Sequence, residues 1–128
     1  MLSSYTERSS TLSENTEAAY QFKQVIDPLP RGRVRFCLNS IYGYMPKAGY
    51  LVTPNFLVHR DEGARAWTLT HKRSGRYVTY AKTINEAKRI ARRLERIGDW
   101  SRIPISGAMS KRFAERAKAI ARPITRVA

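Results

Sequence analysis

Alternating apolar and polar residues predict three β-strands in the middle of the chain. The segments NFLVHR (residues 55–60), RAWTLTH (65–71) and RYVTYA (76–81) are rich in β-branched and aromatic residues, which favour strands. The connections between them, DEGA and KRSG, have the composition of tight turns. We therefore expect a three-stranded antiparallel meander.

The register of this meander decides which side chains share a face, because successive residues of a strand point to opposite sides. Pairing Arg60 with Arg65, and His71 with Arg76, places the larger apolar residues together: Phe56, Val58, Trp67, Leu69, Val78 and Tyr80. The other face is mostly polar and holds Leu57, His59, Ala66, Thr68, Thr70, Tyr77 and Thr79. We expect the apolar face to be buried and the polar face to be partly hydrated.

A helix after the third strand is expected to cover the apolar face. Thr83 and Glu86 have the spacing of a capping box, and Gly98 stands where a left-handed cap would end the helix. Between them one apolar stripe recurs at helical spacing: Ile84, Ala87, Ile90, Ala91, Leu94 and Ile97. The predicted fold class is α+β, with a three-stranded antiparallel β-meander covered on one face by an amphipathic helix, and residues 51–100 as this β-β-β-α core.

The other segments add tails to this single domain. Residues 1–19 are rich in Ser, Thr and Glu, which predicts a flexible polar tail. Residues 20–50 carry a proline or glycine every few positions, which predicts an irregular strap where only RVRFCLN (33–39) favours a short strand. Residues 101–128 are expected to hold a second, basic helix, which begins near Ala108 and ends before Pro123.

The charge of the chain indicates a polyanionic partner. The 24 lysines and arginines exceed the 10 acidic residues, for a formal net charge of +14. Residues 1–30 are slightly acidic, so the positive charge belongs to the part expected to fold. We expect a non-enzymatic protein that binds nucleic acid, DNA before RNA, mainly through phosphate contacts.

Several classes of protein are disfavoured. The single cysteine, Cys37, excludes an intrachain disulfide and a cysteine-based zinc cluster, and it favours a reducing compartment, the cytoplasm. No apolar run approaches the ~18 residues of a membrane span, so no membrane partner is expected. The chain has no glycine-rich phosphate loop and no metal-ligand spacing, and we expect neither cofactor nor metal.

The predicted helices carry the clearest candidate binding residues. At about 100° per residue, one basic arc lies opposite the apolar stripe of the first helix: Lys88, Arg89, Arg92, Arg93 and Arg96. Only Glu86 and Glu95 offset this arc, whereas an ordinary hydrated helix face mixes charges at i,i+4 spacing. The second helix adds a basic side, which includes Lys111, Arg112 and Arg116. Either both helices form one electropositive surface, or the first helix alone binds while the sheet is a scaffold.

The order of three strands followed by a capped helix resembles a known type of DNA-binding domain. The turn and strand from Ser74 to Val78, followed by TINEAKRIARRL (Thr83–Leu94), are similar to the domain of ethylene-response-factor plant transcription factors and of tyrosine-recombinase arm-binding regions. That resemblance implies that the outer face of the sheet enters the major groove. The corresponding reading face here would be His59, Thr68, Thr70, Lys72, Tyr77 and Thr79, with Arg65, Arg73 and Arg76 at the turns.

Two other functions are compatible with these residues. Small basic proteins also occur as phage or plasmid accessory proteins that bind and inhibit an acidic host protein, and the aromatic segment SIYGYMPKAGYL (40–51) has the composition of a protein contact. A metal-independent ribonuclease would use His59, His71, Arg76 and Tyr77. Strand histidines are more often structural than catalytic, and Cys37 has no acid or base near it in sequence.

Overall fold

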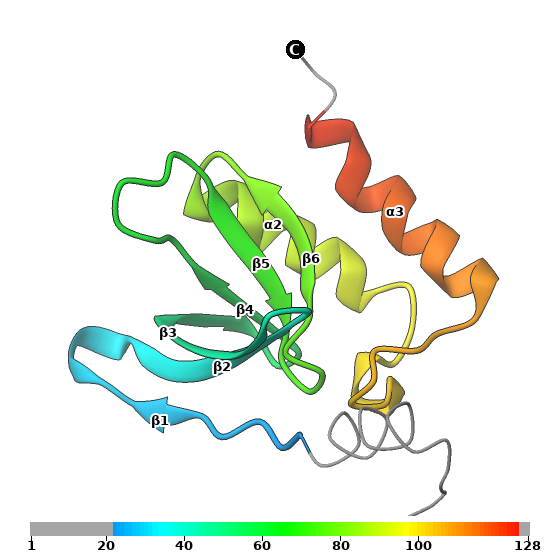
Figure 1. Cartoon of the computed structure of the whole chain (residues 1–128). Coiled ribbons are helices and arrows are strands. Elements are labelled where there is room, and N and C mark those ends of the chain that lie inside the picture. Colours follow the sequence, from blue (N-terminus) through cyan, green and yellow to red (C-terminus); the bar gives the residue numbers. More distant parts are fainter. Residues whose placement is uncertain (1–21, 126–128) are drawn as a thin grey trace, which may run out of the picture.

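The computed structural model describes residues 22–125, and the predicted polar tail, residues 1–19, lies outside this part. The described residues form a curved sheet with two helices beside it (Figure 1). The strands are β1 (Asp27–Pro28), β2 (Val34–Ser40), β3 (Gly43–Thr53), β4 (Phe56–His59), β5 (Trp67–His71) and β6 (Tyr77–Ala81). The helices are α2 (Ile84–Glu95) and α3 (Lys111–Thr125), with short 3-10 turns η1 (Pro30–Gly32) and η2 (Trp100–Arg102).

The α+β class is confirmed, but the prediction of three strands is wrong. The sheet has six strands in sequence order, each antiparallel to its neighbour. The predicted meander is its C-terminal half, β4 to β6. The segment expected to be an irregular strap, residues 20–50, instead supplies β1, β2 and most of β3; of these, only β2 is predicted by the sequence, as the short strand at 33–39.

Pro46 explains why the sequence does not predict β3. A proline in a strand usually argues against it, because proline cannot donate to a neighbouring strand. Pro46 pairs with Cys37 of β2, whose backbone N–H and C=O both bond the side-chain amide of Gln24 on the far side of β2. Cys37 and Pro46 are therefore a non-hydrogen-bonded antiparallel pair, in which the backbone N–H and C=O groups of both residues point away from the partner strand. The missing N–H of Pro46 therefore faces away from β2, toward the side on which this part of β3 pairs with no strand of residues 22–125.

β3 changes partner half-way along its length and thereby folds the sheet. Its first part, up to Gly49, pairs with β2, and its second part, from Tyr50, pairs with β4. A side chain at Gly49 would collide with the backbone carbonyl of Val58 in β4, so only glycine permits this close approach. The bend carries β2 over the face of β4 that points away from the helices. There the ring centroids of Phe36 and His59 lie 5.7 Å apart.

The face predicted to be partly hydrated is consequently buried on β4 and on part of β5. Leu57 and Thr70 are fully buried, and His59 is 2% exposed. The expectation of a polar, accessible outer face holds only near the other edge of the sheet, where Thr68 stays half-buried and Tyr77 is exposed. The sequence could not reveal this, because the cover comes from a strand that lies far away along the chain.

The predicted register also needs correction. Val58 pairs with Leu69 and Phe56 with His71, two residues away from the predicted partners, which leaves the face assignments of β4 and β5 unchanged. In β6 a bulge opposite Leu69 and Thr70 shifts the pairing by one residue. As a result Thr79 and Ala81 are buried, whereas Tyr80, which we expected in the core, is 51% exposed.

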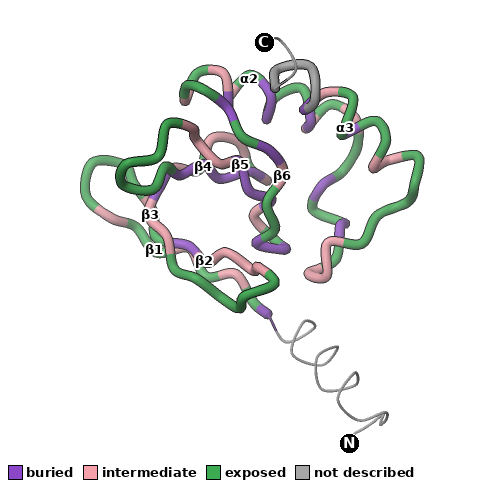
Figure 2. Tube along the Cα trace, turned by 45° about the horizontal axis from the view of Figure 1, so that its top comes forward, coloured by how far each residue is buried: buried purple, intermediate pink, exposed green. Residues whose placement is uncertain are grey.

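Both helices pack on the apolar side of β3 to β6, opposite the face that β2 covers, with α2 across the strands and α3 beside β6 (Figures 1 and 2). Buried and exposed positions alternate along both of them. The core beneath them holds Phe56, Val58, Leu69, Ile90, Leu94 and Trp100, together with smaller residues of both helices. Burial of this apolar surface is the main force that holds the two layers together.

The predicted start of α2 is confirmed, and its predicted end is wrong. The Thr83 hydroxyl accepts a hydrogen bond from the Glu86 backbone N–H at 3.1 Å, while the Glu86 carboxylate accepts from the backbone N–H of Lys82 at 2.7 Å. Gly98 does not adopt the left-handed conformation; the helix ends at Glu95, and its C-terminal cap, Arg96, has an ordinary right-handed backbone. Gly98 is instead a packing position, since a side chain there would collide with the ring of Phe113 in α3.

The second helix is confirmed with shifted bounds. α3 begins at Lys111, three residues later than expected, and continues through Pro123 to Thr125. The Ser110 hydroxyl accepts a hydrogen bond from the Phe113 backbone N–H at 3.1 Å, which explains the later start. A proline inside a helix removes one helical hydrogen bond and crowds the carbonyl four residues before it. Pro123 lies in the last turn of α3, so the preceding turns stay intact.

Candidate nucleic-acid interface

The basic arc predicted on α2 faces away from the core. Arg89, Arg92, Arg93 and Arg96 are exposed, and Lys88 is half-buried. Within residues 22–125 none of these five side chains forms an ion pair; the ion pairs there involve Lys47, His59 and Arg102. The positive charge of the arc is therefore exposed to solvent without an ion-pair partner in the described part of the chain.

The two acidic residues of α2 are directed to backbone groups and do not neutralise the arc. The Glu95 carboxylate accepts hydrogen bonds from the Asn55 backbone N–H at 3.0 Å and from its side-chain amide at 2.9 Å, which fastens the β3–β4 turn to α2. Glu86 caps the start of the helix through Lys82. Both carboxylates therefore act in the fold, at the margins of the arc.

α3 extends the basic arc. Glu95 marks the flank of α2 that faces β3 and β4, whereas α3 packs at β6, so α3 lies beside the opposite flank, which at 100° per residue carries Arg89 and Arg93. On α3, Lys118 lies toward β6, so Arg112 and Arg116 lie on the flank toward α2. Both are exposed. We call the resulting set the basic helical surface: Lys88, Arg89, Arg92, Arg93, Arg96, Arg112 and Arg116.

The candidate residues of the sheet are dispersed. Arg73, Arg76 and Tyr77 are exposed and Lys72 is half-buried, at or next to the β5–β6 turn. Thr68 is half-buried near the other end of β5. Thr70 must be removed from the candidates, because its side chain is fully buried beneath the folded sheet and cannot reach a ligand. His59 and Thr79, which the resemblance placed on the same reading face, are buried as well. Lys111 is exposed at the start of α3.

The two histidines do not form a common site. His71 shares the core face with its partner Phe56, whereas His59 lies on the opposite face against Phe36, so the sheet separates the two imidazoles. Burial lowers the pKa of His59, and the carboxylate of Asp61 opposes this only in part. Burial also lowers the pKa of His71, more strongly than its hydrogen bond to the Trp100 carbonyl raises it.

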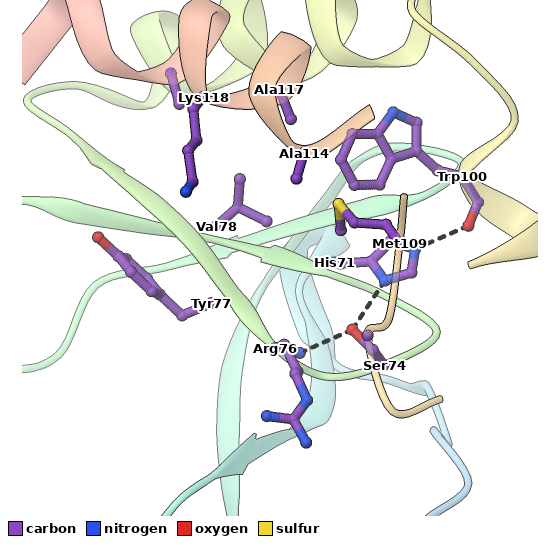
Figure 3. A pocket seen from close by; sticks show the side chains of 12 residues that line it. His71, Ser74, Arg76, Tyr77, Val78, Trp100, Met109, Ala114, Ala117 and Lys118 are labelled. Atoms are coloured by element: carbon purple, nitrogen blue, oxygen red, sulfur yellow. Dashed lines mark hydrogen bonds between the residues drawn. The ribbon is translucent and has the colours of Figure 1, made fainter. Parts of the chain in front are cut away.

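His71 belongs to a buried network that fixes the β5–β6 turn (Figure 3). Its Nε2 lies 2.9 Å from the Trp100 carbonyl oxygen, which can only accept, so Nε2 carries the proton. Nδ1 then accepts from the Ser74 hydroxyl at 2.8 Å, and that hydroxyl accepts from the Arg76 backbone N–H at 3.2 Å. Ser74 is 1% exposed. The two side chains also line a cavity beside α3, but both are almost completely buried, and the Ser74 hydroxyl is held within this network.

A cavity of about 360 Å³ lies between β6, the β5–β6 turn and α3 (Figure 3). Its walls are mostly apolar, from Val78, Trp100, Met109 and the alanines of α3. Arg76, Tyr77 and Lys118 are also among its lining residues. The cavity thus joins the basic α3 to the exposed edge of β6.

The feature that sequence reasoning missed is a pair of exposed tyrosines. The bulge in β6 places Tyr77 and Tyr80 on one face, with ring centroids 4.8 Å apart, although they are three residues apart in a strand. They are 54% and 51% exposed. A regular strand would put them on opposite faces, as we expected, and no residue in the sequence RYVTYA indicates the bulge.

Comparison of the chain with protein-family models, curated proteins and solved structures found no match. Within residues 22–125 no helix has the length and apolar character needed to cross a membrane. In the same part of the chain, no three His, Cys, Asp or Glu side chains come together as a metal site.

Proposed function

We propose that this protein binds nucleic acid without an enzymatic activity, with DNA as the first candidate, and that it holds its ligand mainly through phosphate contacts. The observation that carries this proposal is the basic helical surface, a set of seven lysines and arginines on two adjacent helices with no ion pair among the described residues. Phosphates are the ligands that such a surface attracts most strongly.

The energetics of α2 support the same conclusion. Arg89 and Arg93, like Lys88 and Arg92, are four residues apart, and like charges at this spacing destabilise a helix by about 0.2–0.5 kcal/mol per pair. The arc contributes nothing to the core, because its side chains point away from it. A polyanion bound along the arc would relieve this repulsion. The clustering of like charges is therefore better explained by a ligand than by the stability of the fold.

The salt dependence of binding tests the proposal. Each phosphate contacted on duplex DNA adds about −0.9 to the slope of log affinity against log salt. If the five basic residues of α2 each contact one phosphate, affinity should fall about 500-fold between about 50 and 200 mM salt. A slope near zero, or no binding at low salt, would reject nucleic acid as the ligand.

Charge reversal locates the surface. Replacing Arg89, Arg92 and Arg93 with Glu should abolish binding if the basic helical surface holds the ligand. The matched control replaces Arg31, Arg33 and Arg35 with Glu, because these exposed residues lie near the other end of the sheet and the net charge changes equally. Equal losses in both variants would indicate attraction to the overall charge and would reject a defined surface.

A second candidate function is the binding of an acidic protein. It is favoured by the β2–β3 hairpin, where Ile41 and Tyr42 are each 87% exposed, with Tyr44 and Met45 also accessible. Exposed aromatic and sulfur-containing side chains are enriched in protein interfaces. Affinity capture from nuclease-treated extract separates the two functions: an acidic protein that is retained by the wild-type chain and lost in the variant Ile41→Ser/Tyr42→Ser would favour this second function.

A further inference from the structure

We propose that Tyr77 and Tyr80 form a stacking platform for unpaired bases, so that the ligand of this protein is a single-stranded nucleic acid. The inference rests on the proposed function and specifies its ligand. It is carried by the exposed tyrosine pair, by the cations around it, and by the position of the pair relative to the basic helical surface.

The exposed tyrosine pair takes no part in the hydrophobic core. Tyr77 pairs with Thr70 and Tyr80 with Thr68, so both rings stand on the outer face of the sheet. On this face β2 covers β4 and contacts the β5–β6 turn and β6, but it leaves both tyrosine rings about half exposed. Their rings are tilted by 44° and leave about half of each side chain accessible. Every base has an aromatic face that can stack on such rings, whatever its sequence.

The surroundings of the pair are positively charged. Arg76 precedes Tyr77, and Lys82 follows β6; both are exposed, and residues 76–82 contain no acidic residue. Lys118 of α3 and Tyr77 line the same cavity, and in Figure 3 the Lys118 side chain extends toward Val78 and Tyr77. An aromatic platform bordered by cations is the combination used to hold unpaired strands, in which the cations contact phosphates while the rings contact bases.

The location of the platform favours a single strand over a duplex. The basic helical surface lies on the helical side of the molecule, the tyrosine pair lies on the outer face of the sheet, and α3 stands between them beside β6. A stiff duplex cannot follow this curved path, since its persistence length is about 50 nm. Duplex bases are also stacked on one another, which leaves only their edges available.

α3 supplies a route between the two surfaces. Arg112 and Arg116 lie on its flank toward α2, whereas Lys118 and, by the same helical geometry, Lys111 lie on its flank toward β6. A flexible strand can therefore pass over α3 with its phosphates near cations at each step and its bases free to reach Tyr77 and Tyr80. A single ligand on this path would contact candidate residues of both helices and of the sheet.

The test compares binding of oligothymidylate of about 12 nucleotides with binding of a duplex of about 12 base pairs, at the same salt concentration. Tyr77→Ala and Tyr80→Ala should each weaken single-strand binding by about five- to 150-fold, because stacking contributes about that factor for each base. Tyr77→Phe and Tyr80→Phe should bind like the wild type, since the rings remain. Tyr42→Ala is the matched control, an exposed tyrosine outside the platform, and should leave affinity unchanged.

Two further readouts keep the outcomes distinct. The tyrosine variants should retain the salt slope of the wild type, because they remove no charge, and oligonucleotides that carry 5-iodouracil should crosslink to Tyr77 or Tyr80 on irradiation. Unchanged single-strand affinity in both alanine variants would overturn the platform. If, in that case, the charge reversals on α2 still abolish binding, the proposed function stands and only the platform fails; absence of binding by the wild type to either oligonucleotide rejects both.

Discussion

The two buried histidines predict that the protein loses stability in mildly acidic solution. His59 and His71 are 2% and 3% exposed, and burial lowers the pKa of each below its ordinary value of 6.5. The unfolded chain therefore binds protons near pH 6.5 that the folded chain does not yet bind. Stability is fully present above this pH and decreases as the pH falls, until the folded protein also takes up the protons.

Proton linkage sets an upper limit on this decrease in the free energy of unfolding. One proton bound only by the unfolded chain changes the free energy of unfolding by about 1.4 kcal/mol per pH unit. Between about pH 7.5 and 5.5, a histidine with an unfolded pKa near 6.5 contributes at most about 1.4 kcal/mol, and the two together at most about 2.7 kcal/mol. Asp61 and Asp99 contribute little in this range, because hydrogen bonds lower the pKa of each carboxyl below its ordinary value.

Urea unfolding followed by tryptophan fluorescence measures this loss, because the ring of Trp100 lies 5.5 Å from that of His71. His71→Gln and His59→Gln should each remove part of the pH dependence, and the double variant should show almost none. A wild-type protein with the same free energy of unfolding at both pH values, or a larger one at the lower pH, would refute the reasoning.

Two substitutions test the elements that position the basic helical surface. Thr83→Ala should lower the free energy of unfolding by about 1 kcal/mol in thermal or urea unfolding, because the Glu86 N–H loses its cap, whereas Thr83→Ser should be close to neutral. Gly98→Ala should destabilise by about 1–3 kcal/mol, because the new methyl group collides with Phe113. The added change Phe113→Leu should restore part of that loss, and full stability of Gly98→Ala alone would contradict the packing role assigned to Gly98.

α2 could be predicted from the sequence because its determinants are local. Thr83 and Glu86 lie within one turn, and the stripe that includes Ile90 and Leu94 repeats at a period that only a helix satisfies. The same periodicity places the basic arc opposite the core. Sequence spacing alone therefore assigns the candidate residues of this helix to the correct face.

β3 and the face of Tyr80 could not be predicted, because distant contacts decide them. Pro46 is compatible with a strand only because its backbone points away from β2, and Gly49 marks a bend only because β4 passes close to it. The bulge in β6 depends on how β5 pairs with it, and it moves Tyr80 from the core to the surface. Thr70 fails as a candidate for the same kind of reason, since its cover is supplied from another part of the chain.

Pro46 has a further consequence for the behaviour of the protein in solution. Within residues 22–125, the side of the first part of β3 that faces away from β2 pairs with no other strand. A strand edge of this kind can offer backbone donors and acceptors to a neighbouring molecule, which is a common route to aggregation. A proline in the middle of that stretch interrupts the row of donors, and the bend at Gly49 turns the remainder toward β4. Pro46, which makes β3 difficult to predict from the sequence, thus also hinders β-sheet polymerisation along this edge.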